Sequence, residues 1–320
     1  TRMKRACDHL VDRFVLGRTD DRVRAALRIG AYQLAFLGTP PHAAVDATVG
    51  AVGGRGRSVV NAVLRRVADA EVEYPDAATE LSYPAWLADE LEAFLGPERA
   101  RGAMEAMNRP ATTTFRDDGY VQDPASQLVV DAVGAESGEL IVDLCAAPGG
   151  TASGLAASGA IVVAGDRKRS RTGLVVANAE RVGRPLLALV ADGRAAPLAD
   201  GVADRVLVDA PCSGIGSLRR RPDARWRIEP ETAGRLAELQ TGLLDEAARL
   251  LRPGGLLIYS VCTLGSTEGR EVVEAAIERH ALEPVPGPGA PWLELDGMSV
   301  LVPDETDGMM LARLRRPATR

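Results

Sequence analysis

The chain has 320 residues, 46% of them hydrophobic and 26% charged, with a net charge of −6 and a pI near 5.3. This length exceeds what a single hydrophobic core normally serves, so we expect two or more domains, and the acidic balance excludes a surface coated in positive charge. No apolar run approaches the roughly 20 residues of a membrane span, and the N-terminal stretch has no apolar signal core, which together predict a soluble protein of the cytoplasm.

Residues 1–70 have the patterns of a helical domain. Apolar residues recur there at helical spacing, as at Val23, Leu27 and Leu34. Ser58 is placed to cap a later helix, whose predicted apolar face carries Val59, Val63 and Val67. Prolines and glycines separate these helical runs, so we predict a small α-helical module.

Residues 71–119 carry two further helical patterns, Pro84–Phe94 and Pro97–Met107, and are predicted to link the helical module to the rest of the chain. In residues 120–320, strand-like runs alternate with helical runs. That alternation is typical of an α/β domain built on a doubly wound parallel sheet.

The first strand-like run of this α/β domain, Leu140–Asp143, leads directly into a turn of small residues. The turn consists of Cys145, Ala146, Ala147, Pro148, Gly149, Gly150 and Thr151. Glycine can take backbone angles closed to other residues and lets a ligand approach the backbone, and such folds bind ligands at the carboxyl ends of their strands. For this stretch alone, an ordinary strand-turn-helix connection is an equally good interpretation.

Three more strand-like runs also end in an aspartate. The four strand-end acids are Asp143, Asp166, Asp192 and Asp209. Asp166 lies close to the spacing, roughly 20 residues, that separates a nucleotide-binding turn from the carboxylate that holds ribose hydroxyls. A single strand-end acid is usually a solvated cap, but the repetition beside a glycine turn favours a nucleoside-type ligand.

Two cysteines are also predicted at this edge of the sheet. Cys212 follows Asp209 closely, and a helix predicted at Thr232–Leu251 precedes a strand, Leu256–Cys262, that delivers Cys262. Either thiol alone is more simply explained as a small buried hydrophobe. The pair indicates nucleophilic chemistry, because a thiolate is a strong nucleophile and nearby arginines would raise the thiolate fraction of a group whose pKa is normally about 8.5.

The other cysteines and the histidines give no sign of a metal centre. The four cysteines contain no C-x-x-C pair, and the three histidines are isolated in the sequence: His9, His42 and His280. We therefore predict no structural zinc, no other metal site and no disulfide framework.

Two clusters of basic residues follow strand-end acids. One is Arg167–Arg171, and the other contains Arg219, Arg220, Arg221, Arg225 and Trp226. Arginine makes bidentate contacts with phosphate and stacks on bases, and tryptophan can stack in the same way. A solvated charged face is the alternative for both, and the second cluster is the better candidate for RNA binding.

These motifs resemble those of the RsmB/Sun/Nop family of RNA (cytosine-5) methyltransferases. The stretches that carry the resemblance are Asp143–Gly150, Asp209–Gly214, Arg219–Trp226 and Ser260–Cys262. Three N-terminal stretches resemble the NusB-like domain of bacterial rRNA members of that family: Leu27–Leu34, His42–Asp46 and Val60–Arg66. The most specific element is Asp-Ala-Pro-Cys followed by a second cysteine after the next core strand.

The resemblance implies an all-α NusB-like RNA-binding domain, a remnant of an RNA-binding subdomain in the linker, and a Rossmann-like methyltransferase domain that uses S-adenosylmethionine. The implied substrate is a cytosine of RNA, in 16S rRNA or an assembly intermediate of the small subunit. Residues Cys145–Thr151 would hold the methionine part of the cofactor, Asp166 the ribose hydroxyls and Asp192 the adenine side. Asp209 would also lie beside the methyl group.

For the reaction, the resemblance implies that Cys262 is the nucleophile, that Cys212 helps to release the product and that Asp209 meets N3 of the target base. C5 of cytosine is too electron-poor to attack a methyl group. Addition of a thiolate at C6 turns the ring into an enamine whose C5 can accept the methyl group. The implied mechanism is therefore covalent.

The sequence departs from the family pattern in three places. Thr151 follows Gly150 where the family usually has a lysine, about ten residues separate Pro110 from Val121 where the family usually has several dozen, and the helical module is short at its start. A second hypothesis is therefore a catalytically weakened RNA-binding or ribosome-assembly factor that keeps the cofactor pocket as a scaffold. A nicotinamide oxidoreductase ranks third, because no G-x-G-x-x-G follows the first strand.

Overall fold

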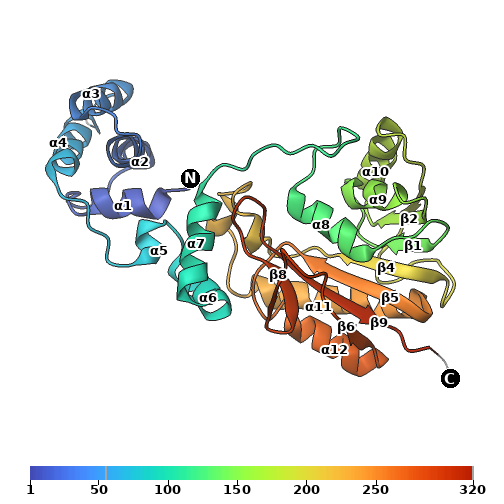
Figure 1. Cartoon of the computed structure of the whole chain (residues 1–320). Coiled ribbons are helices and arrows are strands. Elements are labelled where there is room, and N and C mark those ends of the chain that lie inside the picture. Colours follow the sequence, from blue (N-terminus) through green and yellow to red (C-terminus); the bar gives the residue numbers. More distant parts are fainter. Residues whose placement is uncertain (55, 319–320) are drawn as a thin grey trace. The chain divides into compact units, whose positions relative to one another are not determined.

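The structure is a computed structural model that describes residues 1–54 and 56–318 (Figure 1). The chain divides into two compact units, Thr1–Asp89 and Glu90–Arg320. The division lies inside helix α6 (Ala85–Leu95), within the stretch predicted as a linker. In the described part of the chain, no helix is both long enough and apolar enough to span a membrane.

The first unit contains helices and loops but no strand among its described residues. The helices before α6 are α1 (Lys4–Asp12), α2 (Asp21–Phe36), α3 (Pro41–Ala51), α4 (Gly56–Asp69) and α5 (Ala77–Glu80). Leu10, Leu27 and Leu64 are buried in one core shared by α1, α2 and α4. A Cβ atom on Gly30 would lie 2.3 Å from Leu64 Cδ1, so glycine at this position lets α2 and α4 pack closely.

The start of α4 differs from the prediction. Ser58 cannot be the N-cap, because the helix begins at Gly56 and Ser58 lies within its first turn. Val63 and Val67 are buried as expected, but Val59 is 40% exposed. The buried face of α4 therefore begins at Val60 rather than at Val59 and otherwise includes the predicted Val63 and Val67.

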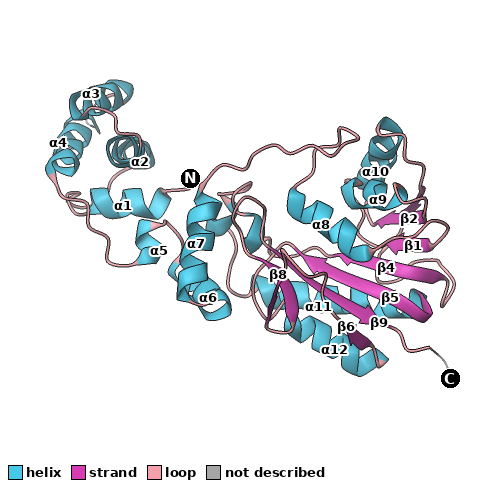
Figure 2. Cartoon of the chain, viewed as in Figure 1, coloured by secondary structure: helices cyan, strands magenta, loops and turns pink. Residues whose placement is uncertain are grey.

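The second unit is built on one mixed sheet (Figure 2). Its strands are β1 (Leu140–Asp143), β2 (Ile161–Asp166), β3 (Leu187–Val190), β4 (Ala203–Asp209), β5 (Leu251–Val261), β6 (Glu283–Val285), β7 (Leu293–Leu295), β8 (Met298–Leu301) and β9 (Met309–Arg315). They are ordered β3-β2-β1-β4-β5-β9-β8-β7, and β6 also pairs with β9. Strands β1 to β5 are parallel, and β9 is antiparallel to β5. The order reverses between β1 and β4, so their carboxyl ends form the switch point where such sheets bind ligands.

Helices cover both faces of this sheet (Figures 1 and 2). One face carries α8 (Pro124–Val133), α9 (Gly150–Ala156) and α10 (Arg169–Arg181), and the other carries α11 (Thr232–Leu250) and α12 (Arg270–His280). Helix α7 (Pro97–Asn108) precedes them in the chain. Ile141, Leu207 and Ile258, from three adjacent strands, are fully buried in one core with apolar residues of α8, α9 and α10.

The predicted fold class, an all-helical N-terminal part followed by a Rossmann-like α/β domain, is confirmed. Two details differ. Strand β5 begins at Leu251, which pairs with Ala203, and residues 252–255 bulge out before pairing resumes between Arg205 and Leu256. Strands β6, β7 and β8 have three or four residues each. A strand of that length is too short to show a periodic pattern, so the sequence does not predict this antiparallel edge.

Candidate active site

A cavity of about 460 Å³ opens at the carboxyl ends of β1, β2, β4 and β5. Its polar lining consists of three cysteines, three aspartates and four basic residues: Cys145, Cys212, Cys262, Asp166, Asp192, Asp209, Arg167, Lys168, Arg171 and Arg221. Leucine side chains at positions 144, 239 and 243 give it an apolar wall. The structure therefore brings together most of the acids and thiols that the sequence placed at one sheet edge.

Cys212 and Cys262 form a close thiol pair in this cavity. Their sulfur atoms lie 3.3 Å apart, although the residues follow two different strands, β4 and β5. Donation from the Cys212 thiol lowers the pKa of Cys262 against the opposing effect of burial, and the nearby Arg221 guanidinium lowers it further. Donation to Cys262 and burial raise the pKa of Cys212. Cys262 is thus the sulfur that carries negative charge more easily.

Asp209 ends β4 beside this thiol pair. Its carboxylate accepts a hydrogen bond from Ser260 Oγ at 3.0 Å, across the β4–β5 pair. Burial raises the pKa of Asp209 to about 6, and the hydrogen bond from Ser260 only partly offsets that effect. Asp209 can therefore hold a proton in the cavity close to neutral pH.

Asp143 ends β1 but does not line the cavity, because it is fully buried beneath the turn. Thr151 Oγ1 donates to one carboxylate oxygen at 3.0 Å, and the backbone N–H of Cys145 donates to the other at 3.2 Å. Asp143 therefore ties the first and last residues of the turn together. Burial, together with the charge of Asp209, raises the pKa of Asp143 to about 7.

The turn itself presents few of its side chains to the cavity. Cys145 and Ala147 line it, whereas five other members do not: Ala146, Pro148, Gly149, Gly150 and Thr151. Gly149 has a φ of 107°, and a Cβ atom there would lie 3.0 Å from Val175 Cα of α10, so only glycine fits without strain. Arg171 donates to the carbonyl oxygen of Ala147 at 2.9 Å, which fixes the turn to α10.

The pKa of Asp143 leads to a prediction about stability. A carboxyl whose pKa is raised on folding stabilises the fold fully below its unfolded pKa of about 4, and this contribution is lost as the pH rises through 7. Relative to Asp143→Asn, the parent should lose roughly 2 to 4 kcal/mol of unfolding free energy between about pH 5 and pH 8. Urea unfolding of both proteins at several pH values measures this difference. Parallel pH profiles would contradict it.

Asp166 and Asp192 line the side of the cavity farther along the sheet. Asp166 accepts from the Lys168 backbone N–H at 2.9 Å and is paired with Arg171 Nε at 3.1 Å. Both oxygens of Asp192 accept from the Arg194 guanidinium, at 3.1 and 2.8 Å. These hydrogen bonds lower the pKa of Asp192 to about 2, so it stays ionised under all ordinary conditions.

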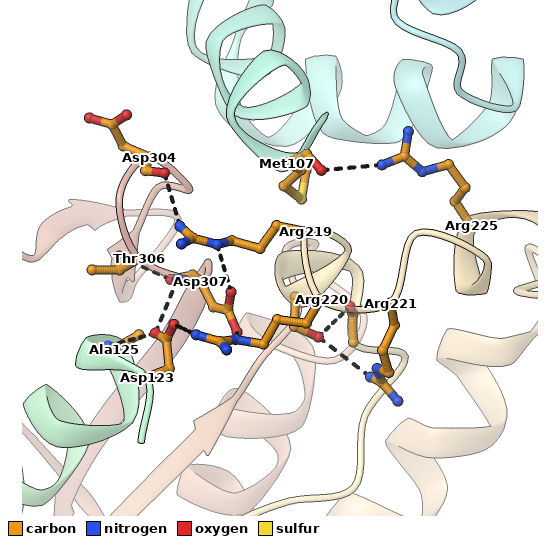
Figure 3. A network of polar contacts seen from close by, with 12 residues as sticks. Met107, Asp123, Ala125, Arg219, Arg220, Arg221, Arg225, Asp304, Thr306 and Asp307 are labelled. Carbon is orange, nitrogen blue, oxygen red and sulfur yellow. Dashed lines mark hydrogen bonds and ion pairs between the residues drawn. The ribbon is translucent and has the colours of Figure 1, made fainter. Parts of the chain in front are cut away.

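The arginines after Cys212 do not act alike. Arg219 is 5% exposed and donates to the Asp304 carbonyl oxygen at 3.0 Å (Figure 3). Arg220 donates to Asp307 Oδ2 at 2.9 Å and also binds Asp123, whose other oxygen caps α8 (Figure 3). This ion-pair network joins the loop after β4 to α8 and to the loop between β8 and β9.

Arg225 and Trp226 also lie away from the cavity. Arg225 is fully buried, and its guanidinium donates to Asn108 Oδ1 at 2.8 Å and to the Met107 carbonyl oxygen (Figure 3). Trp226 is half-buried in a 3-10 turn, Ala224–Trp226, and does not line the cavity. Arg219 and Arg225 are buried and bonded within the protein. We therefore correct the sequence-based prediction that these two residues contact RNA.

Arg221 is the member of this cluster that faces the cavity. Its guanidinium donates to Ser217 Oγ at 3.4 Å and points away from the Arg220 network (Figure 3). It lies near enough to Cys262 for its charge to lower the pKa of that thiol. Gly214 makes room for it, because a Cβ atom there would lie 2.3 Å from Arg221 Nη2. Where the resemblance led us to expect a lysine after Gly150, the cavity thus has cations from other parts of the chain.

Neighbouring arginines should therefore respond differently to substitution. Arg220→Ala would leave the buried Asp123 carboxylate without its cation and Asp307 with only the more distant Arg219, and should cost about 2 to 4 kcal/mol of stability. Arg221→Ala should cost less than about 0.5 kcal/mol of stability but lower the activity of this cavity about tenfold or more. Urea unfolding and an activity assay on both variants measure the two effects. Equal stability losses would contradict this division of roles.

Sequence reasoning missed the polar residues behind the thiols. Glu268 and Gln240 are buried: Glu268 accepts from the N–H of Ser213, the residue after Cys212, and Gln240 donates to Glu268. One signal was present in the sequence: Gln240 occupies a core-facing position of the helix Thr232–Leu250, three residues before Leu243 and seven before Ala247. No pattern marked Glu268. Among the described residues, no group of three or more His, Cys, Asp or Glu side chains could hold a metal ion.

Comparisons with known sequences match both units. The family described as 16S rRNA methyltransferase RsmB/F matches residues 131–315, and the family described as NusB matches residues 1–69. The chain is 36% identical to Ribosomal RNA small subunit methyltransferase B of Thermus thermophilus, over 92% of this chain and 80% of that protein. It is 31% identical to the protein of the same name from Vibrio cholerae, over 78% of this chain and 72% of that protein.

Two solved structures from Pyrococcus horikoshii share the fold. A methyltransferase homolog protein is 23% identical with a TM-score of 0.63, over 76% of this chain and 100% of the other. NSun6, solved with SFG, is 27% identical with a TM-score of 0.56, over 62% of this chain and 53% of the other. These similarities agree with the methyltransferase-like arrangement of the sheet.

Proposed function

Because the chain belongs to the RsmB/F family of 16S rRNA methyltransferases, which use S-adenosylmethionine, and carries a domain of the NusB family, we propose that it methylates C5 of a cytosine in RNA. The observation that carries this proposal is the pair of thiols 3.3 Å apart in one cavity with Asp209. The relatives' names point to rRNA of the small subunit, either free or in an assembly intermediate, as the substrate. We also propose that the reaction takes place in the cytoplasm.

The side chains of the cavity fit S-adenosylmethionine. Asp166 offers its carboxylate to the ribose hydroxyls. Asp192 offers its carboxylate on the side of the cavity where the adenine would bind. Leu144 and Leu243 form an apolar wall suited to a base. The turn Cys145–Thr151 lies at the switch point, where its backbone would hold the methionine part. When bound, the cofactor supplies a methyl group on a positively charged sulfur.

Cys262 would attack C6 of the cytosine as a thiolate. Its lowered pKa raises the thiolate fraction near neutral pH, which is the requirement for attack. Addition at C6 moves electron density toward N3 and makes C5 nucleophilic. Asp209, whose pKa of about 6 lets it share a proton near neutral pH, would stabilise the charge that develops at N3.

Cys212 would act after methylation. The C5 proton must then leave and the bond between Cys262 and C6 must break, and both steps need a group that can move protons. Cys212 keeps its proton more firmly than Cys262, and its sulfur lies within hydrogen-bonding distance of the nucleophile. It would therefore give its proton to the departing Cys262 sulfur, and the Cys212 thiolate left behind would accept the C5 proton, whose bonding electrons re-form the C5–C6 double bond.

The RNA must present an unstacked base to reach these groups. Cytosine within a duplex hides C5 and C6 between its neighbours, so a loop or an unfolded assembly intermediate is the favoured target. Cations at the rim could hold the phosphates of such a strand: Arg167, Lys168, Arg171 and Arg221. Of the RNA-binding residues predicted from the sequence, Arg221 is the one that we retain at this site.

Mapping 5-methylcytosine tests the proposal. Unmodified small-subunit rRNA, incubated with the protein and S-adenosylmethionine, should gain 5-methylcytosine at one or a few positions, and cells that lack the gene should lose the same marks. Binding of the cofactor measured by calorimetry, without any methyl transfer to RNA or to small-subunit particles, would instead support the assembly-factor hypothesis and overturn this one.

A further inference from the structure

Glu268 is a buried carboxylate that the mechanism above does not use. It lies in the loop between β5 and α12 and is 2% exposed. Its Oε1 atom accepts from the Ser213 backbone N–H at 2.9 Å and from Gln240 Nε2 at 2.9 Å, and its Oε2 atom accepts from Ser213 Oγ. A buried carboxylate is costly unless it is hydrogen-bonded, and three donors provide that here.

These hydrogen bonds hold the residue that follows each thiol. Ser213 follows Cys212, Thr263 follows Cys262, and the Ser213 and Thr263 hydroxyl oxygens lie 2.7 Å apart. Glu268 binds Ser213 from the other side. The cluster therefore joins the chain segments after β4 and β5 directly behind the pair of sulfur atoms.

Two further contacts fix this cluster in the domain. Gln240 Nε2 donates to the Pro211 carbonyl oxygen at 2.9 Å as well as to Glu268, so the residues on both sides of Cys212 are held. The Tyr259 hydroxyl, from β5, donates to the backbone oxygen of Glu268 at 2.6 Å. The loop that carries Glu268 is thus fixed to the strand that delivers Cys262.

The charge of Glu268 also acts on the pair unequally. Besides donation to Cys262 and burial, the negative charges of Glu268 and Asp209 raise the pKa of Cys212. Arg221 lies on the side of Cys262 and lowers the pKa of that thiol. Glu90, a second carboxylate near Glu268, has its own pKa raised by burial and by the charge of Glu268. Glu268 therefore adds to the difference in pKa that the hydrogen bond between the two thiols and the charge of Arg221 produce.

We propose that Glu268 is a positioning residue that holds Cys212 against Cys262 through Ser213 and Thr263 and sets its buried negative charge behind Cys212. The inference rests on the proposed function in treating Cys262 as the attacking sulfur. The geometry itself concerns the thiols alone. It can therefore be tested without RNA.

Two substitutions separate the charge from the hydrogen bonds. In Glu268→Gln, the amide oxygen can accept from Ser213 N and Gln240, while the amide NH₂ donates to Ser213 Oγ, which then donates to Thr263. That variant keeps the cluster and loses the charge. Glu268→Ala loses both.

The first readout is the rate at which diamide joins Cys212 and Cys262. The two thiols lose two protons and two electrons to diamide, which becomes the hydrazine, and peptide mass mapping identifies the disulfide. The parent should cross-link rapidly because the sulfurs are 3.3 Å apart. Glu268→Gln should remain near the parental rate, and Glu268→Ala should be slower by about tenfold or more.

The second readout is single-hit alkylation with iodoacetamide at neutral pH. The parent should be modified mainly at Cys262, and Glu268→Gln should shift the ratio several-fold toward Cys212, because the charge that opposed ionisation of Cys212 is gone. The matched control is Glu246→Gln, which alters a buried carboxylate of α11 bonded to the Ala196 N–H at 2.7 Å and to Arg249. It should leave both readouts at parental values.

Rapid cross-linking in folded Glu268→Ala, or an unchanged alkylation ratio in Glu268→Gln, would overturn the inference. If the alanine variant does not fold, the glutamine variant still decides through its alkylation ratio. A parent with the expected thiol chemistry but no methyl transfer to RNA would contradict the proposed function and leave the role of Glu268 in the pair supported.

Discussion

Replacing Cys262 with alanine should reduce methyl transfer to RNA by about 10⁴-fold or more, because the reaction then has no nucleophile to activate C5. The residual thiol, Cys212, cannot take over, since burial and the charges of Glu268 and Asp209 oppose its ionisation and its sulfur occupies a different position. Transfer of a labelled methyl group from S-adenosylmethionine to unmodified small-subunit rRNA measures the loss. Binding of the cofactor, followed by calorimetry, should remain close to the parental value.

The matched control is Cys7→Ala. Cys7 is buried in the core of the first unit and contributes nothing to the cavity. This variant should keep near-parental activity and lose only about 1 kcal/mol of stability, as expected for a small truncation in a core. A Cys262→Ala protein that methylates cytosine at the parental rate would show that the nucleophile has been assigned to the wrong residue.

Replacing Cys212 with alanine should have a different effect, since it blocks a later step. Turnover should fall by about 10² to 10⁴-fold, the usual worth of a positioned proton-transfer group. Attack by Cys262 should still occur, so the protein should accumulate as a covalent complex with its RNA. Denaturing gel electrophoresis reveals that complex as a band of reduced mobility, and peptide mapping should place the RNA on Cys262.

The double variant Cys212→Ala, Cys262→Ala provides the control for this result. It should form no covalent complex, because the attacking sulfur is missing. A complex that persists in the double variant would mean that another residue forms the bond. Rapid turnover by the single Cys212→Ala variant, without accumulation of the complex, would show that product release does not depend on this thiol.

The strand-end acids and the two thiols show what local sequence patterns predict correctly. Parallel strands in a doubly wound sheet end at the same edge, so recognition of each strand was sufficient to place Asp166, Asp209 and Cys262 near one cavity. Periodicity predicted the long helix Thr232–Leu250 almost to its last residue. Short antiparallel strands such as β7 carry too few residues to show a period, and they remained outside the prediction.

The arginines after Cys212 show what local sequence patterns do not predict. Positions 219, 220 and 221 are all arginine. The first two are bound by acids far away in the chain, Asp307 and Asp123, whereas Arg221 faces the cavity. The fate of each side chain depends on which carboxylate the fold brings within reach. Sequence spacing between positions 123, 220 and 307 holds no information about that distance.

The amino-acid sequence by itself determined the kinds of chemistry available here: a parallel sheet with acids at its strand ends, two thiols after separate strands, and a helical module before them. Only the tertiary structure decided which thiol ionises first, which arginine remains at the site, and that Glu268 binds behind the pair. The physical reason is that charge, burial and hydrogen bonding act over a few ångströms in space. Residues such as Cys212 and Glu268 acquire their properties from neighbours that are distant along the chain.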